Sequence, residues 1–137
     1  MNDHLRPNIF PAIRYADAEA GIDFLKRAFG ANEKAVHRGE DGVIHHAELA
    51  LGAGLVMLGQ QRGDGERGGA TPRALASTIS LYITVPDPDA HHAVACAAGA
   101  TVVRELEDTD YGSREYSVRD PEGNLWSFGT YDPYDYP

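Results

Sequence analysis

His46 and Glu48 are the pair of side chains in this sequence that is best suited to chemistry. They stand two positions apart in the segment 45–51, where polar and apolar residues alternate. Such alternation is typical of a β-strand, and residues two apart on a strand point to the same face. Three uses stay open for the pair: a hydrogen-bonded couple lining a pocket, a general acid and base, or two ligands of an unconventional metal site. His45 points to the opposite face of the strand.

Other residues that could do chemistry are better explained by structure. His91 and His92 are adjacent on a predicted helix, so their side chains diverge by about 100° and are expected to flank the helix and face solvent. Cys96 is near the C-terminal end of that helix, away from the helix N-terminus or cation that activates a thiol, and we expect it to be inert. Trp126 alternates onto the helix-facing side of a strand and is expected to anchor the core.

The elements that position these residues occur twice. Tyr15-Ala16-Asp17 opens a segment that ends at Gly30-Ala31, and Val85-Pro86-Asp87 opens one that ends at Gly99-Ala100. In each copy the aspartate is a predicted helix N-cap and the glycine a predicted stop. The apolar stripes expected to pack on a sheet are Ile22, Leu25, Ala28 and Phe29 in the first helix, and Ala90, Val94, Ala97 and Ala98 in the second.

Each copy reads as a strand, a helix and then three strands. We therefore predict an α+β fold with two tandem βαβββ modules, which form a curled mixed sheet around a concave cleft with the helices outside. Module one covers residues 8–60, a glycine-rich linker 61–75, module two 76–131 and a tail 132–137, all within a single domain. The glycines at 52–54 and the sequence Asp-Pro-Glu-Gly at 120–123 predict tight turns between strands.

Composition restricts the possible partners and the compartment. The formal net charge of −9 argues against nucleic acid and favours cationic ligands. No apolar run approaches the about 20 residues that span a bilayer, and residues 1–7 lack the apolar stretch of a signal peptide. The single cysteine excludes an internal disulfide. We therefore expect a cytoplasmic protein that binds neither membrane nor nucleic acid.

The duplicated module, the run Asp-Pro-Glu-Gly-Asn-Leu-Trp-Ser-Phe at 120–128 and the run Tyr-Gly-Ser-Arg-Glu at 111–115 together resemble the vicinal oxygen chelate superfamily. This group includes glyoxalases, bleomycin resistance proteins and extradiol dioxygenases. The segment His46-Ala47-Glu48-Leu49, with residues 55–58, is similar to its glyoxalase-like branch. The resemblance covers about residues 8–131.

The resemblance implies where a divalent metal would be held. The first-strand positions fall on Phe10 and Ser80, and the last-strand positions fall on Leu58 and Ser127. The phenyl and isobutyl groups have no donor atom, and a serine hydroxyl is a poor ligand for Zn, Fe or Ni. Among the neighbouring residues only Met57 adds a donor, a weak thioether. We therefore expect no metal at this site, with a divalent metal as the alternative.

The same register predicts which residues line the concave face. Ligand-binding candidates on it are Phe10, Arg14, His46, Glu48, Leu58, Ser80, Tyr82, Glu115, Ser117 and Ser127, and the face also includes Ala12, Ala50, Val56, Thr84 and Leu125. Arg14 and Glu115 could instead pair with each other, since unpaired buried charges are costly. Tyr111 is a further ligand-binding candidate that could cover the cavity mouth, as could the tyrosine-rich segment 131–136.

Two functions follow from these residues. The first is a metal-independent homodimer that binds and sequesters a small molecule, as the metal-less members of the resembled group do in antibiotic resistance. The second is a glyoxalase-type isomerase or lyase that uses His46 and Glu48 or an atypical metal. Beyond that pair, no residue is predicted to be catalytic.

Overall fold

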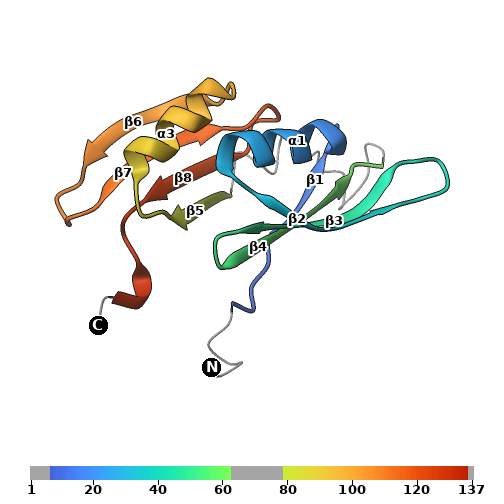
Figure 1. Cartoon of the computed structure of the whole chain (residues 1–137), viewed down its shortest axis with the longest axis horizontal. Helices are drawn as coiled ribbons and strands as arrows, with labels where there is room; N and C mark the ends of the chain where they lie inside the picture. The colour runs from blue at the N-terminus through green and yellow to red at the C-terminus, as the bar shows by residue number, and fades with distance from the viewer. Residues whose placement is uncertain (1–6, 63–78, 136–137) are drawn as a thin grey trace. The chain divides into compact units, whose positions relative to one another are not determined.

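The computed structural model describes residues 7–62 and 79–135 of the chain. It divides into two compact units, 1–72 and 73–137, and each unit has the predicted βαβββ order (Figure 1). The elements of the first unit are β1 (Ala12–Tyr15), α1 (Ala18–Phe29), β2 (Asn32–Arg38), β3 (Ile44–Leu51) and β4 (Gly54–Gln60). Those of the second are β5 (Ser80–Thr84), α3 (Pro88–Ala97), β6 (Thr101–Asp108), β7 (Arg114–Arg119) and β8 (Leu125–Gly129), followed by a 3-10 turn over Pro133–Asp135.

Each unit contains its own four-stranded mixed sheet. The strand order is β1-β4-β3-β2 in the first and β5-β8-β7-β6 in the second, so the two topologies are the same. In both sheets the first and last strands of the unit pair in parallel, and the remaining pairs are antiparallel. The α+β fold and its duplication are therefore as predicted. Most of the predicted linker 61–75 and the end of the tail lie outside the described residues.

The helices begin and end at the predicted residues. The side chain of Asp17 accepts a hydrogen bond from Ala20 N, and that of Asp87 accepts one from Ala90 N, each at 3.1 Å. Gly30 closes α1 with a φ of 74°, and Gly99 follows α3 with a φ of 95°. Aspartate satisfies amides that the first turn leaves without partners, and glycine adopts the left-handed conformation without a Cβ clash.

The helix stop at Gly30 can be tested by substitution. A Cβ at this position would meet nothing within 4 Å, so Gly30→Ala adds backbone strain and no steric overlap. We expect the free energy of unfolding to fall by about 1 kcal/mol, as measured by urea denaturation. Gly30→Asn is the matched variant, because asparagine tolerates the left-handed region better, and it should lose less. Equal stability of the alanine variant and the original protein would contradict this account of the helix end.

The core of the first unit lies between α1 and one face of its sheet. The predicted stripe of α1 is buried, and it packs with Tyr15, Ala47 and Leu49, which are all 0% exposed. Val56 and Leu58 belong to this buried face as well, because Leu58 is paired with Ala47, and Val56 with Leu49, across the β3–β4 ladder. The expectation that Val56 and Leu58 share the polar face with His46 and Glu48 is therefore wrong. The register of β4 is shifted by one residue from the expected one, which moves both side chains to the core.

In the second unit, Trp126 is fully buried as predicted, together with Tyr116, Val118 and Phe128. The buried face of α3 differs from the predicted stripe. It contains Pro88 and Ala95, with His91 half-buried beside them, whereas Val94 is 54% exposed. The reason is that an imidazole ring covers more of the aromatic core below α3 than the small alanine stripe would.

No helix in the ranges 7–62 and 79–135 is long and apolar enough to cross a membrane.

Candidate functional site

The polar face of the first sheet contains a histidine–glutamate patch, which consists of His37, His46 and Glu48. Nε2 of His46 lies 3.0 Å from Oε2 of Glu48, so the predicted pairing of the two side chains is present. His37 on β2 is opposite His46 on β3, and their rings stack with centroids 6.0 Å apart. Both members of the ion pair are partly exposed, so the patch is open to a ligand.

Charge in this patch is concentrated on Glu48. The hydrogen bond from His46 lowers the pKa of the Glu48 carboxyl below its usual value, and the charges of His46, Lys34 and His37 add to this effect despite some desolvation. Glu48 is therefore ionised at neutral pH, and it can accept a proton or attract a cation.

The donor set at the positions implied by the resemblance does not fit a divalent metal. Phe10 precedes β1 and is 43% exposed, while Leu58 is a core residue at 3% exposure. The β4 residue on the polar face is Met57, which is paired with Glu48 and with Ala12. Replacing Leu58 by Met57 in the set adds a thioether, a soft ligand that Zn, Fe and Ni sites rarely use. In the described ranges there is also no group of three or more His, Cys, Asp or Glu side chains placed to hold a metal ion.

The polar face of the second sheet carries the predicted serines and glutamate. Ser117 and Ser127 are opposite each other on β7 and β8, and their hydroxyl oxygens are 2.7 Å apart. Ser80 begins β5 and is exposed. Glu115, at 4% exposure, is the buried charge of this face, and its Oε1 accepts a hydrogen bond from Arg104 Nη2 at 3.0 Å and from the Tyr111 hydroxyl at 2.9 Å. This carboxylate is therefore held in a defined position.

The electrostatics of Glu115 balance two effects. Burial raises the pKa of the carboxyl, but the hydrogen bonds from Tyr111, Arg104 and Ser113 outweigh it, and the net pKa is lowered. Arg104 contacts a second carboxylate, because its Nη1 is 3.0 Å from Oε1 of Glu107. Two carboxylates thus share one guanidinium, which leaves this part of the face with a net negative charge. Arg14 belongs to the first unit, and its pairing with Glu115 stays a prediction.

Tyrosines border Glu115 on this face. Tyr82 on β5 donates from its hydroxyl to the carbonyl oxygen of Tyr131 at 2.8 Å, and Thr84 donates to the same oxygen. Tyr111, in the turn between β6 and β7, is 51% exposed. The predicted ligand-binding residues Tyr82, Tyr111 and Glu115 therefore lie together with Tyr131, which follows β8. We name the four residues Tyr82, Tyr111, Glu115 and Tyr131 the tyrosine–glutamate patch.

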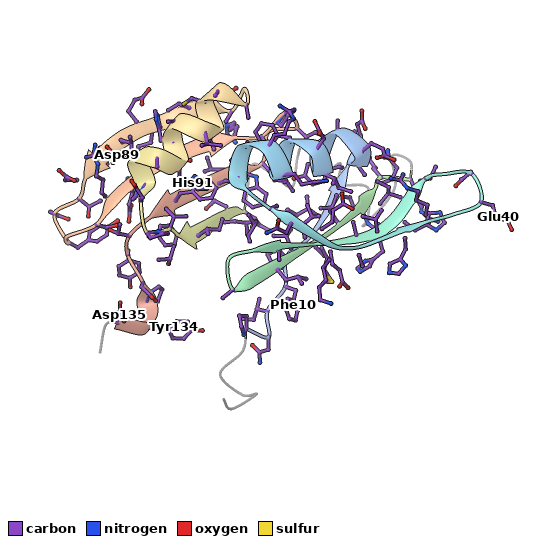
Figure 2. All side chains as sticks on the ribbon, viewed as in Figure 1. Phe10, Glu40, Asp89, His91, Tyr134 and Asp135 are labelled. Carbon is purple, nitrogen blue, oxygen red and sulfur yellow. The ribbon has the colours of Figure 1, made fainter. Side chains whose placement is uncertain are left out.

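The histidines of α3 are not solvent-facing, contrary to the prediction. His91 is labelled on α3 in Figure 2. Its ring centroid lies 4.2 Å from that of Phe128, and its Nδ1 is 2.5 Å from the Tyr116 hydroxyl. Burial raises the pKa of that hydroxyl, which therefore stays protonated. His92 packs edge-on against Tyr116, and its Nε2 lies 3.2 Å from Glu105. The two imidazoles therefore pack α3 onto the sheet, because they contact the large rings of Tyr116 and Phe128.

The turn at 120–123 serves the fold rather than a ligand. Asp120 is 4% exposed, and its carboxylate accepts hydrogen bonds from the backbone amides of Glu122 and Asn124 at 3.0 Å each. It also accepts from Asn124 Nδ2 at 2.9 Å and from the indole Nε1 of Trp126 at 3.2 Å. One carboxylate therefore shapes the turn and satisfies the buried indole N–H at the same time.

Sequence reasoning missed Arg104 and His37, and it considered Met57 only as a neighbour of the implied position Leu58. Arg104 alternates with Val102 and Leu106 on one face of the segment 101–106, which is an available signal for an inward-facing cation. His37 could be found from the Asp-Gly turn at 41–42, which places β2 opposite β3 in a hairpin. Met57 could be found from the spacing of 70 residues between copies, since Phe10 and Ser80 are 70 apart, as are Met57 and Ser127.

Comparisons with known proteins place these features in context. The sequence profile of the Glyoxalase/Bleomycin resistance protein/Dioxygenase superfamily matches residues 3–128. Uncharacterised proteins of Mycobacterium bovis and Mycobacterium tuberculosis are each 38% identical over 133 residues, which is 94% of this chain and 86% and 77% of theirs, respectively.

Solved structures share the fold. TioX from Micromonospora sp. ML1 is 32% identical with a TM-score of 0.72, and the match covers 90% of this chain and 94% of TioX. The bleomycin-binding protein from Streptomyces verticillus, solved with copper(II)-bleomycin, is 21% identical with a TM-score of 0.64, and the match covers 92% and 97% of the two chains. The second likeness, at its low identity, shows the fold alone.

Proposed function

Because the chain belongs to the Glyoxalase/Bleomycin resistance protein/Dioxygenase superfamily, we propose that it binds and sequesters a small molecule without using a divalent metal. The observation that carries this proposal is the set of side chains at the positions where the resemblance implies ligands. They are Phe10, Leu58, Ser80 and Ser127, and Met57 takes the place of Leu58 when the β3–β4 register is applied. A Lewis-acid role needs nitrogen, thiolate or carboxylate donors that these side chains lack. Binding requires only a polar face with fixed hydrogen-bonding groups and apolar surroundings.

The polar sheet faces supply such groups. The histidine–glutamate patch offers an ionised carboxylate, and the tyrosine–glutamate patch offers aromatic rings beside a second carboxylate. The protein carries a formal net charge of −9, so a cationic ligand is attracted at long range and an anionic one is repelled. We include in the proposal that the protein acts as a homodimer in the cytoplasm, where the single cysteine stays reduced.

Ligand-dependent thermal stabilisation tests this function. We expect at least one compound from a panel of metal-free bleomycin and cationic, anionic and neutral aromatic compounds to raise the melting temperature. The stabilisation should grow with ligand concentration and reach about 2.7 kcal/mol at a hundredfold excess over Kd. EDTA should not change it, and protein purified without chelator should hold little metal. Near-stoichiometric Ni, Zn or Fe, or loss of binding in EDTA, would overturn the proposal.

A second candidate is a glyoxalase-type isomerase or lyase, and the 3.0 Å contact between His46 and Glu48 favours it. An ionised Glu48 beside an imidazole has the composition of a general base with a proton-transfer partner. This enzyme would turn over the hemithioacetal of methylglyoxal and glutathione, and Glu48→Gln would abolish turnover while leaving the melting temperature nearly unchanged. Equal, blank rates for both proteins would eliminate this candidate.

A further inference from the structure

Three tyrosine rings gather on the polar face of the second sheet from three separate segments of the chain. Tyr131 follows β8 and stands between the other two. Its ring is 6.2 Å from that of Tyr82, at an interplanar angle of 64°, and 5.9 Å from that of Tyr111, at 85°. Rings inclined at 64° and 85° meet edge to face, so they leave aromatic surface uncovered that flat stacking would cover.

Hydrogen bonds from two of the ring hydroxyls and from the Tyr131 backbone hold the three tyrosines in place. The Tyr82 hydroxyl donates to Tyr131 O, the backbone N–H of Tyr131 donates to Ser113 Oγ at 3.0 Å, and the Tyr111 hydroxyl donates to Glu115. The rings nevertheless stay accessible, with Tyr82 38% and Tyr111 51% exposed. Tyr82 and Tyr111 are thus fixed at their hydroxyl ends and Tyr131 by its backbone, while aromatic surface remains available to a ligand.

The charge at this place is negative. Glu115 and Tyr82 meet over Gly129. A Cβ atom added to this glycine would lie 2.5 Å from Cγ of Glu115 and 2.8 Å from the hydroxyl oxygen of Tyr82, so the two side chains are neighbours. A side chain at Gly129 would fill the space that they occupy. Glu115 and Glu107 together outweigh the single guanidinium of Arg104. Aromatic faces are also negative, because of the ring quadrupole.

We propose that Tyr82, Tyr111 and Tyr131 form an aromatic cage for a fully alkylated ammonium group, with Glu115 as the counter-charge beside it. This inference rests on the proposed function and names the ligand class for the second unit. The hydroxyl protons of Tyr82 and Tyr111 are already donated within the protein, so they are not offered to an anion. A primary ammonium needs several acceptors, and Glu115 Oε1 already accepts twice, whereas a quaternary ammonium needs none.

Choline and its neutral isostere 3,3-dimethyl-1-butanol test the cage, because they share shape and differ in charge. We expect choline to shift the tyrosine ring resonances in an NMR titration of the full chain. The neutral isostere should bind at least about tenfold more weakly, since it lacks the attraction to the ring faces and to Glu115. Equal affinity of the two compounds would overturn the cage.

Two substitutions at Tyr111 distinguish the contribution of its aromatic ring to binding from that of its hydroxyl group. Tyr111→Leu removes an aromatic face from an exposed turn and should weaken choline binding about tenfold, whereas Tyr111→Phe keeps the face and should remain within about threefold. Tyr134→Leu is the matched control, because Tyr134 is 90% exposed on the C-terminal 3-10 turn (Figure 2) and should not change affinity. A Tyr111→Leu variant that binds like the original protein would contradict the proposal.

The outcomes also separate this inference from the function on which it rests. If a compound of the thermal-shift panel binds and choline does not, the cage is wrong and the binding function stands. If neither choline nor any panel compound binds, both are wrong. Circular dichroism of each variant shows whether it is folded, and Tyr111→Phe provides an affinity readout even if the leucine variant unfolds.

Discussion

Replacing Asp120 by alanine is expected to lower the free energy of unfolding by about 3–4 kcal/mol. The variant leaves the indole N–H of the fully buried Trp126 without this acceptor, and it removes the acceptor of the Glu122 and Asn124 backbone amides. Each buried donor that loses its partner costs about 1–3 kcal/mol. Urea denaturation at neutral pH, with the slope compared between the proteins, measures the loss.

Two further variants sharpen this test. Asp120→Asn keeps the shape but places an amide nitrogen where a carboxylate oxygen accepts, so it should recover less than half of the lost stability. Asp110→Ala is the matched control, because this aspartate is exposed in the turn between β6 and β7 and should change stability by less than about 0.5 kcal/mol. If Asp120→Ala were as stable as this control, the carboxylate would not be holding the turn and the indole.

Replacing Glu115 by glutamine is expected to cost about 2 kcal/mol at pH 7 and to remove a pH dependence of stability. Glutamine keeps the size of the side chain but weakens two charge-assisted hydrogen bonds, from Arg104 and Tyr111. The pKa of the Glu115 carboxyl is lowered in the folded protein. Its contribution is therefore fully present above the unfolded value of about 4.3, and it is lost as the pH falls through the lowered folded pKa.

The measurement is urea unfolding from pH 7 down to about pH 3 for both proteins. The difference between them should be largest at neutral pH and shrink at the acidic end. Glu107→Gln is the control, because Glu107 contacts the same guanidinium at 3.0 Å but its side chain is 54% exposed. Exposed ion pairs contribute at most about 1 kcal/mol, so this variant should stay close to the original protein. A constant difference across the pH range would show that Glu115 acts through packing alone.

The two hypotheses depend on different patches, and each patch lies in a different unit. The first unit presents His46 and Glu48, which the enzyme hypothesis needs, and the second presents the tyrosines and Glu115, which the ligand class needs. Variants at Glu48 and Glu115 therefore report on different hypotheses. A protein that binds through the second patch should retain its affinity for choline after Glu48→Gln.

Local sequence patterns were sufficient for the elements of this protein. Aspartate and glycine at the ends of each copy predict the limits of α1 and α3, because capping and a left-handed stop depend on one or two residues. Alternation predicts that His46 and Glu48 lie on one face, and the two side chains are in contact. Ser117 and Ser127, also predicted on one polar face, are in contact as well. The duplicated βαβββ order follows from these local signals.

Tertiary structure decided what alternation leaves open. The first-unit register puts Met57 on the polar face and Leu58 in the core, because a strand of continuous apolar residues such as β4 has no pattern that tells its two faces apart. The large rings of Tyr116 and Phe128 decided which face of α3 packs, because they contact His91 and not the predicted stripe of Ala90, Val94, Ala97 and Ala98. Arg104 became the partner of Glu115 through the pairing of β6 with β7. Contacts between elements depend on strand register and on how side chains from different segments fit together, and no single position encodes either.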